Sequence, residues 1–307
     1  MSVNYLKEVL KRLLKVLIKA LVKARILDDF VLVHVDGGIC SQMQFYMIGQ
    51  FFKTKGYRVK YDLSWFKTDG FDLLNKHRRD FVLITAFPKL AFETPNKVEL
   101  FFYRYLNREN NYYDDATAFD WLHLSSPIYL SGYYHIPKEL YLQYSSLFVI
   151  DSTIFNSRNR AMLADIRNRE ETVAVHVRRG DLSVFHMAYG EPVPISYFKN
   201  SINYICEKVD SPHFYIFSDD HKWVEEVLLP EIGDKINCTR IDFNDVGNGY
   251  CDLFLMASCK HKVTSKGSFG KYASFLSNRE DSIITLYDDS YERKQWDGKY
   301  PGFVFIK

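Results

Sequence analysis

Apolar residues recur every three to four positions over residues 3–27, which predicts a single amphipathic helix. Lysines repeat along its opposite side, and Glu8 is the only acidic residue within it. A helix with one basic and one apolar face is typical of elements that lie on membrane surfaces. The alternative is a helix that packs its apolar stripe on the protein itself or on a second copy. The stripe consists of Leu6, Val9, Leu10, Leu13, Leu14, Leu17, Ala20 and Leu21, and the basic residues are Lys7, Lys11, Arg12, Lys15, Lys19 and Lys23.

The pattern then changes to short strands. Residues 30–35 form an apolar run, Gly37 and Gly38 follow it, and a helical pattern extends from Met43 through Phe52. A strand, two glycines and a helix are the start of a βαβ unit, which places backbone N–H groups near a cleft. A second strand is expected over residues 57–62.

The middle of the chain, residues 65–156, is rich in aromatic residues and has few clear strands, and we assign acceptor recognition to it. Helices are expected at 71–74, 98–105 and 157–169, and an extended segment at 128–134. We divide the chain into a helix at 1–27, an N-terminal α/β domain at 28–160 and a C-terminal Rossmann-like domain at 161–307.

The C-terminal half alternates strands and helices, which predicts a doubly wound parallel sheet. Such sheets bring the carboxyl ends of their strands to one edge. The expected strands are 172–177, 213–218, 236–243, 260–265 and 283–287, and the expected helices are 195–209, 221–229 ending at Pro230, 248–258 and 268–278.

Residues 172–181 contain the densest group of polar residues that we consider as ligand-binding candidates. Residues 172–181 begin as a β-branched apolar strand and end in His176, Arg178, Arg179 and Asp181. Because strand side chains alternate, His176 and Arg178 should share one face and Arg179 the other. Two guanidiniums after a strand suit an anion such as a nucleotide diphosphate. A structural Arg–Asp pair is the alternative reading. The same edge should hold Asp219, Asp220, Ser265 and Ser268.

The composition of the 307 residues and the absence of two motifs narrow the set of ligands that the protein can be expected to bind. Hydrophobic residues make up 47% of the chain, and the net charge of +2 gives no support for nucleic-acid binding. The sequence has no Walker-type phosphate loop and no Asp-x-Asp pair for a metal-bridged diphosphate, so we expect arginine, without a metal or other cofactor, to neutralise a leaving diphosphate.

The five cysteines have no metal-binding spacing, and we interpret them as reduced thiols of a cytoplasmic protein. Lysines interrupt residues 1–27, which are therefore unlike a signal peptide.

His176-Val-Arg-Arg-Gly-Asp181 resembles the His-x-Arg-Arg-x-Asp signature of the α-1,2-fucosyltransferase family. Four more stretches are similar in order and spacing. They are Phe217–Asp220 with Trp223, Asp252–Met256 with Cys259 and His261, Ser265–Phe269, and the Asp36–Gln42 turn. The resemblance covers roughly residues 31–56 and 170–290.

The resemblance implies a two-domain GT-B-like fold, GDP-β-L-fucose as donor, inversion to an α-linkage and no required metal. It implies that Arg178 binds the diphosphate and that His176 and Asp252 lie at the guanosine end. Arg179 and Asp181 would brace the loop or reach the acceptor side. The remaining donor-binding candidates are Gly37, Gly38, Asp219, Asp220, Ser265, Ser268 and Phe269.

The turn departs from the family pattern, because Cys40-Ser41 replaces the usual Gly-Asn before Gln42. For the general base the candidates are Asp181, His186 and Glu191, each of which could instead be structural.

The activity that the resemblance implies is transfer of fucose to the 2-OH of a terminal β-galactose in O-antigen or other surface polysaccharide synthesis. A lipid-linked oligosaccharide at the inner membrane face is one candidate acceptor. The alternatives are another nucleotide-sugar transferase or a non-catalytic, membrane-associated binding protein.

Overall fold

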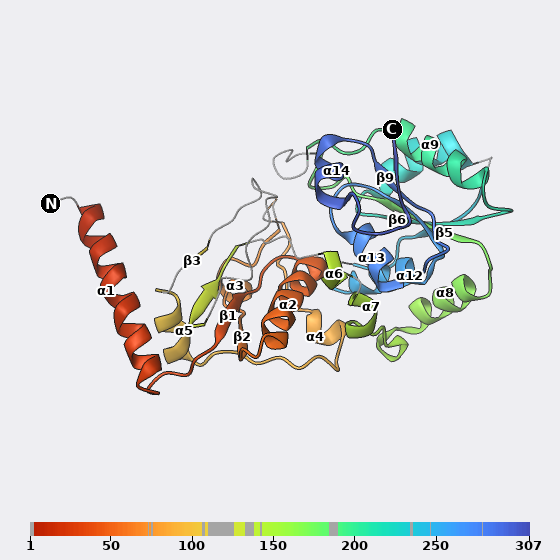
Figure 1. Cartoon of the computed structure of the whole chain (residues 1–307). Coiled ribbons are helices and arrows are strands. Elements are labelled where there is room, and N and C mark those ends of the chain that lie inside the picture. Colours follow the sequence, from red (N-terminus) through yellow and green to blue (C-terminus); the bar gives the residue numbers. More distant parts are fainter. Residues whose placement is uncertain are drawn as a thin grey trace. The chain divides into compact units, whose positions relative to one another are not determined.

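The computed structural model describes residues 3–72, 74, 76–105, 108–109, 126–132, 138–141, 143–183, 190–233, 236–245, 247–277 and 279–307 (Figure 1). The chain forms two compact units. Unit 1 contains residues 1–70, 79–83 and 89–140, and unit 2 contains 71–78, 84–88 and 141–307.

The change between the units at residue 140 comes earlier than the boundary near 160 that the sequence suggested. The reason is that two helices near this boundary, α7 (Tyr144–Leu147) and α8 (Ser157–Arg167), contact helices of unit 2. Helix α7 packs on α13 (Phe269–Ser277), and α8 packs on α12 (Tyr250–Ser258). The predicted separate helix at the N-terminus belongs to unit 1.

Unit 1 is built on a parallel sheet. In the described part of the chain its strand order is β2-β1-β4-β3, with Val31 opposite Val59 on one side and Ile128 on the other. From the central strand β1 the chain moves first to β2 on one side and later to β4 on the other. The carboxyl ends of the neighbouring strands β1 and β4 therefore flank the switch point of this sheet. The strands are β1 (Val31–His34), β2 (Val59–Asp62), β3 (Arg108–Glu109) and β4 (Ile128–Leu130).

The helices of unit 1 start with α1 (Val3–Lys23), α2 (Ile39–Thr54), α3 (Trp65–Thr68) and α5 (Lys97–Tyr103), and α4 (Leu83–Ala86) lies where the units exchange segments. Helix α5 begins at a capping box, in which the Asn96 side chain accepts from the Val98 and Glu99 amides and Glu99 accepts from the Asn96 amide.

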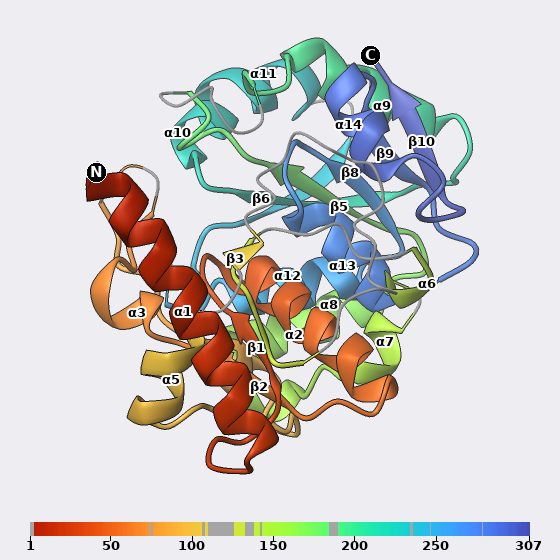
Figure 2. The same cartoon turned by 60° about the vertical axis from the view of Figure 1, so that its left-hand side comes forward.

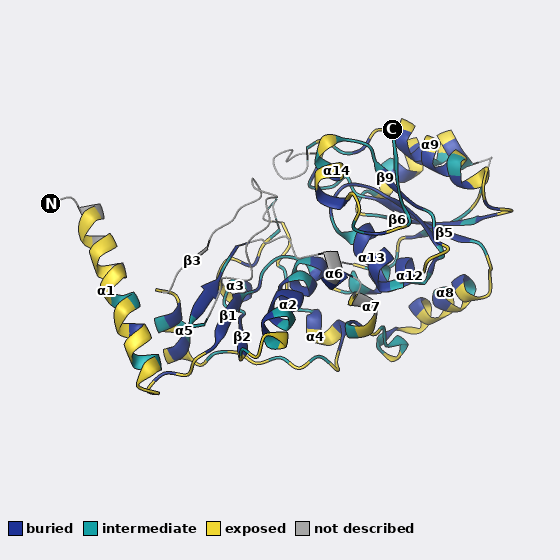
Figure 3. Ribbon diagram, viewed as in Figure 1, coloured by how far each residue is buried: buried dark blue, intermediate teal, exposed yellow. Residues whose placement is uncertain are grey.

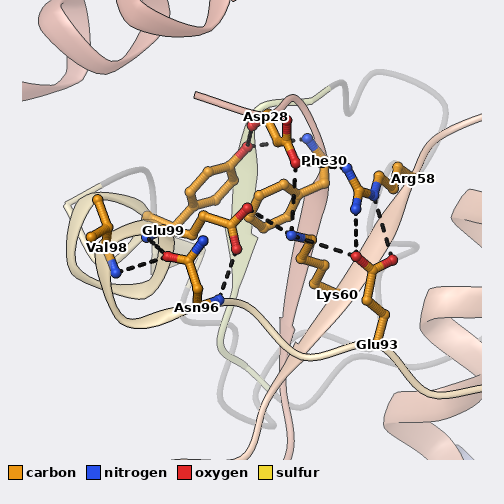
Figure 4. A network of polar contacts seen from close by, with 9 residues as sticks. Asp28, Phe30, Arg58, Lys60, Glu93, Asn96, Val98 and Glu99 are labelled. Atoms are coloured by element: carbon orange, nitrogen blue, oxygen red, sulfur yellow. Dashed lines mark hydrogen bonds and ion pairs between the residues drawn. The ribbon is translucent and has the colours of Figure 1, made fainter. Parts of the chain in front are cut away.

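A charged network ties α5 to the sheet (Figure 4). Buried Lys60 donates to Glu99 (2.6 Å) and lies over the Phe30 ring, 4.8 Å from its centroid. Arg58 bridges Asp28 and Glu93. The network lies toward the amino end of the strands, and we interpret it as structural.

Helix α1 is attached to unit 1 through only part of its surface. Ile18 is buried, and Leu21 and Val22 pack on the same small core, which contains Leu27, Phe30 and Tyr103. Most of the remaining helix is exposed (Figure 3). Figure 2 shows α1 lying in front of the strands of unit 1 with α5 at its side. The exposed apolar residues are Tyr5, Leu6, Val9, Leu10, Leu13, Val16 and Leu17. Among the described helices, none has the length and apolar character required to cross a membrane.

Unit 2 contains the predicted doubly wound sheet. In the described residues its order is β10-β9-β8-β5-β6-β7, with every pair parallel. All six residues of β5 are buried, as expected for a central strand covered on both faces. The strands are β5 (Thr172–Val177), β6 (His213–Ser218), β7 (Asn237–Ile241), β8 (His261–Thr264), β9 (Ile284–Tyr287) and β10 (Phe303–Ile306).

From β5 onward, the helical elements of unit 2 alternate with the strands along the chain. The Val173, Val175 and Val177 side chains of β5 pack against Phe198 and Ile202 of α9. The elements are α6 (Lys138–Tyr141), which begins in unit 1, α7 (Tyr144–Leu147), η2 (Ser152–Ile154), α8 (Ser157–Arg167), α9 (Ile195–Cys206), α10 (His221–Trp223), η3 (Val224–Leu228), α11 (Leu229–Ile232), α12 (Tyr250–Ser258), α13 (Phe269–Ser277) and α14 (Ser290–Trp296).

Several details differ from the sequence prediction. Phe71 forms an isolated antiparallel bridge with Arg78, so the predicted helix at 71–74 was wrong. Pro230 lies in the first turn of α11 and continues the helix, because that turn needs no donor from it. Helix α2 begins at Ile39, earlier than Met43, and α14 and β10 were not predicted. All five cysteines are free thiols, as predicted.

Candidate functional site

The candidate site of unit 2 lies where the chain reverses direction across its sheet. From β5 the chain moves to β6 and β7 on one side, and later to β8, β9 and β10 on the other. The neighbours β5 and β8 thus flank the switch point, where open α/β sheets bind ligands at the carboxyl ends of their strands. His176 and Arg178 come from β5 and the residue after it, and Ser265 follows β8.

Arg178 is held in one orientation by Asp181. Its Nε and Nη2 atoms donate to the two Asp181 carboxylate oxygens at 3.2 and 2.7 Å, and its backbone N–H donates to the Ser265 hydroxyl at 3.0 Å. The side chains of Arg178 and Asp181 keep 22% and 16% of their surface exposed. The guanidinium is therefore fixed, and the Arg178 side chain keeps part of its surface exposed.

The turn after β8 fits closely around this guanidinium. Gly267 has a φ of +88°, and Arg178 Nη1 occupies the space that a side-chain carbon at 267 would need. A residue with a side chain would be strained in that backbone conformation and would also push Arg178 away. Gly267 therefore allows the guanidinium to lie against the backbone of the turn.

His176 is a neutral, buried partner of the same turn. Its Nδ1 lies 3.1 Å from the Ser265 hydroxyl, and its ring stacks on Phe269 with centroids 5.5 Å apart. Burial, followed by the nearby positive charges of Lys271 and Arg178, lowers the pKa of His176 to about 3. The imidazole is uncharged at neutral pH and acts through hydrogen bonding and stacking.

Whereas Arg178 lies against the turn after β8, Arg179 lies beside α10. Its guanidinium lies over the Trp223 ring, 4.2 Å from the centroid, and 3.8 Å from the Asp220 carboxylate. Asp219 accepts from the Arg179 and Gly180 amides at 2.8 and 3.2 Å, and burial raises its pKa. Asp220 also accepts from the Trp223 amide at the start of α10. These contacts hold the loop after β5 in place.

Lys271 is a site residue that the sequence analysis missed. Its ammonium donates to the Ser265 carbonyl oxygen at 2.6 Å and forms an ion pair with Glu292 at 2.5 Å, and neither side chain has exposed surface. A lysine inside the buried run of α13 was the available signal, because a buried lysine needs a partner. The partner lies on α14, which the sequence analysis did not predict.

The remaining site candidates that the sequence indicated in unit 2 lie on different segments of the chain. Asp252 lies on α12 and accepts from Asn244 at 2.6 Å, while burial raises its pKa to about 6. Ser268 precedes α13, and its carbonyl oxygen accepts from the Tyr272 amide, as expected of an N-cap residue. Glu191 is exposed. His186 lies outside the described residues.

Gly37 and Gly38 belong to unit 1, in the turn between β1 and α2. Gly37 has a φ of +70°, and Arg79 Nη1 lies 3.3 Å from the position of a side-chain carbon at 38. Buried Gln42 holds this turn, because its amide nitrogen donates to the Gly37 and Asp80 carbonyls and its oxygen accepts from the Val82 and Leu83 amides. The described residues contain no group of three or more His, Cys, Asp or Glu side chains able to hold a metal ion.

Comparison with known families agrees with the Arg178 motif. The family model described as Glycosyl transferase family 11 matches residues 88–307. The chain belongs to this family. Among relatives, the O-antigen biosynthesis glycosyltransferase WbnK of Escherichia coli is 26% identical over 146 residues, covering 45% of this chain and 46% of WbnK.

The galactoside α-(1,2)-fucosyltransferase 2 of Sus scrofa is 30% identical over 122 residues, covering 38% of this chain and 34% of its own length. The matched segments thus span about half or less of these family 11 relatives. Among solved structures, the fucosyltransferase NodZ from Bradyrhizobium aligns with a TM-score of 0.46 at 13% identity, covering 81% of this chain and 93% of NodZ.

Proposed function

We propose that this family 11 protein is an inverting α-1,2-fucosyltransferase. It transfers L-fucose from GDP-β-L-fucose to the 2-OH of a terminal β-galactose, in surface polysaccharide synthesis. In this proposal the two units are the halves of a GT-B-like enzyme, with the donor on unit 2. The observation that carries it is the partly exposed Arg178 side chain, fixed by Asp181 at the switch point of a parallel sheet.

The proposed role of Arg178 follows from the charge that develops on the leaving diphosphate during transfer. The acceptor hydroxyl attacks the anomeric carbon of fucose and gives up its proton to a basic side chain or to water. The bond to the β-phosphate breaks at the same time and its electron pair leaves with GDP, so negative charge grows on that phosphate. A preorganised guanidinium stabilises this charge, and removal of such a group typically costs about 10²–10³ in rate. His176 and Phe269 offer the donor a neutral ring pair beside the charge. Arginine takes the place of a metal, so activity should survive chelation by EDTA.

The test is a donor and acceptor screen on the full chain. GDP-fucose, GDP-mannose and UDP-galactose are each supplied with methyl β-D-galactopyranoside, and the linkage of the product is determined by NMR. We expect transfer from GDP-fucose alone, loss of about 10²–10³ in kcat for Arg178→Ala, and little change for Arg167→Ala, an exposed arginine on α8. Full turnover in Arg178→Ala would contradict the proposed role.

Two alternatives give different results. A transferase with another donor would move sugar from GDP-mannose or UDP-galactose. A non-catalytic binding protein would bind GDP without turnover in any combination.

The exposed face of α1 supports a location at the membrane. Leu10, Leu13 and Val16 are more than half exposed, and the helix has six basic residues against one acidic residue. An apolar stripe beside a basic stripe complements an anionic bilayer, and each basic residue near such a surface contributes about 1 kcal/mol. We place the enzyme on the inner face of the cell membrane, where a lipid-linked oligosaccharide would be its acceptor.

A further inference from the structure

A polar cluster in unit 1 occupies the place that corresponds to the Arg178 site in unit 2. His34 ends β1, Asp62 ends β2, Tyr129 lies on β4, and Asp36 follows β1 by two residues. The cluster thus surrounds the carboxyl end of β1 at the switch point between β1 and β4. Ligands of open α/β sheets bind in this position.

Asp62 and Tyr129 form the inner part of the cluster. Asp62 is 1% exposed, and its two carboxylate oxygens accept from the Ser64 amide (2.9 Å) and the Tyr129 hydroxyl (2.8 Å). The same hydroxyl lies 3.3 Å from His34 Nδ1, and Phe45 meets the His34 ring edge-on. These contacts fix the orientation of the imidazole.

His34 and Asp36 form the outer part. His34 Nε2 lies 3.5 Å from the Asp36 carboxylate, and the two side chains are 17% and 14% exposed. Burial opposes protonation of His34, but hydrogen bonds to Asp36 and Asp62 outweigh it and raise its pKa to about 9. At neutral pH the accessible edge presents an imidazolium donor beside a carboxylate acceptor.

That pair suits one class of ligand. A sugar hydroxyl both donates and accepts, so a single hydroxyl can accept from the imidazolium Nε2 and donate to the carboxylate beside it. One imidazolium with two carboxylates carries a net negative charge, which disfavours anionic ligands and leaves a neutral polyol.

We propose that the His34–Asp36 edge binds the acceptor sugar, with one sugar hydroxyl entering the 3.5 Å contact between the two side chains, where it accepts from His34 Nε2 and donates to Asp36. This assignment rests on the proposed function, because it makes the bound polyol the acceptor of the transfer reaction. It places acceptor recognition on the β1 turn of unit 1.

The experiment measures acceptor and donor kinetics of the full chain with methyl β-D-galactopyranoside and GDP-fucose. Loss of a hydrogen bond to a charged group should raise the acceptor KM by about 10-fold to 100-fold in Asp36→Asn and His34→Gln. The GDP-fucose KM should remain unchanged. Asp69→Asn, an exposed carboxylate elsewhere in unit 1, is the control and should stay within about twofold.

Saturation-transfer NMR with methyl β-D-galactopyranoside, without donor, separates this proposal from the proposed function. If wild type transfers fucose while folded Asp36→Asn and His34→Gln proteins keep sugar binding and acceptor KM, the acceptor site is wrong and the proposed function stands. If wild type transfers no fucose but its sugar signal disappears in Asp36→Asn, the sugar site stands and the proposed function fails. Thermal unfolding and GDP affinity establish that each variant is folded.

Discussion

The Arg178 guanidinium lies against the backbone of Gly267, in the space that any side chain there would fill. The two residues come from opposite sides of the switch point in unit 2. The turn at 267 therefore shapes the proposed anion site as directly as the arginine does.

Replacement of Gly267 by alanine should damage the site beyond its effect on the backbone. The methyl group would displace Arg178, and the positive φ adds strain of about 1 kcal/mol. We expect GDP affinity and kcat to fall at least tenfold, measured by calorimetry and fucose transfer. Gly298→Ala is the matched control, because Gly298 has a φ of +69° with nothing within 4 Å of the added carbon. Equal effects of both variants would show that strain alone is responsible.

The Lys271–Glu292 pair should be essential for stability and for the turn. Removal of one partner leaves an unpaired buried charge, so Lys271→Met or Glu292→Gln should each cost about 3–5 kcal/mol in urea unfolding. A Lys271→Met/Glu292→Leu double variant should recover most of this loss. It should still bind GDP weakly, because the Ser265 carbonyl lacks its donor.

The exposed Lys199–Glu231 pair provides the comparison, with its side chains 41% and 48% exposed. Lys199→Met should cost less than about 1 kcal/mol. Equal losses for Lys199→Met and Lys271→Met would contradict the importance of burial.

Much of unit 2 could be predicted from its sequence, because its central strands β5 and β6 are largely apolar runs with polar residues after them. The Lys271–Glu292 pair could not be predicted, since α14 is short and polar and shows no clear periodicity. The role of Pro230 depended on helix geometry, because proline ends some helices and begins others.

Unit 1 was harder to predict for a related reason. His34, Asp62 and Tyr129 meet only because β1 pairs with both β2 and β4, and pairing between distant segments leaves no local pattern. The strand β4 is only three residues long. The sequence indicated the glycine turn, but the order of the strands was required to bring the His34 cluster together.

The His34 cluster should make stability depend on pH in a defined window. The folded-state pKa of His34 is raised from 6.5 to about 9, so its contribution is complete below pH 6.5 and lost as the pH rises through 9. The pKa of Asp62 is lowered in the folded protein, so its contribution is lost as the pH falls below the ordinary range of an aspartate.

The corresponding measurement compares urea unfolding of wild type and His34→Gln. The difference in free energy should be about 3 kcal/mol at pH 6 and much smaller at pH 10. The groups that face His34 are Asp36, Asp62 and the Tyr129 hydroxyl. A difference that stays constant over this range would mean that His34 is neutral in the folded protein.

Helix α1 should bind anionic vesicles through its exposed stripe. Ile18, Leu21 and Val22 already pack on unit 1, so the exposed stripe residues Leu10 and Leu13 can be changed without disturbing the attachment of the helix. We expect Leu10→Ser/Leu13→Ser to reduce binding to phosphatidylglycerol-containing vesicles more than tenfold in a sedimentation assay, because each buried leucine contributes about 2 kcal/mol. Val149→Ser, an exposed apolar residue in unit 2, should have no effect.

A change of charge on α1 distinguishes two partners for the exposed stripe, a membrane surface and a second copy of the chain. Lys19→Glu/Lys23→Glu reverses two exposed charges on α1, and on a bilayer each reversal should weaken binding about fivefold or more and make it less sensitive to salt. The same reversal should leave an apolar dimer intact. The wild-type protein could instead sediment as a dimer that does not bind anionic vesicles, with the Leu10→Ser/Leu13→Ser variant monomeric. The stripe would then be a self-association surface, and the proposed transfer would take place without α1 lying on the membrane.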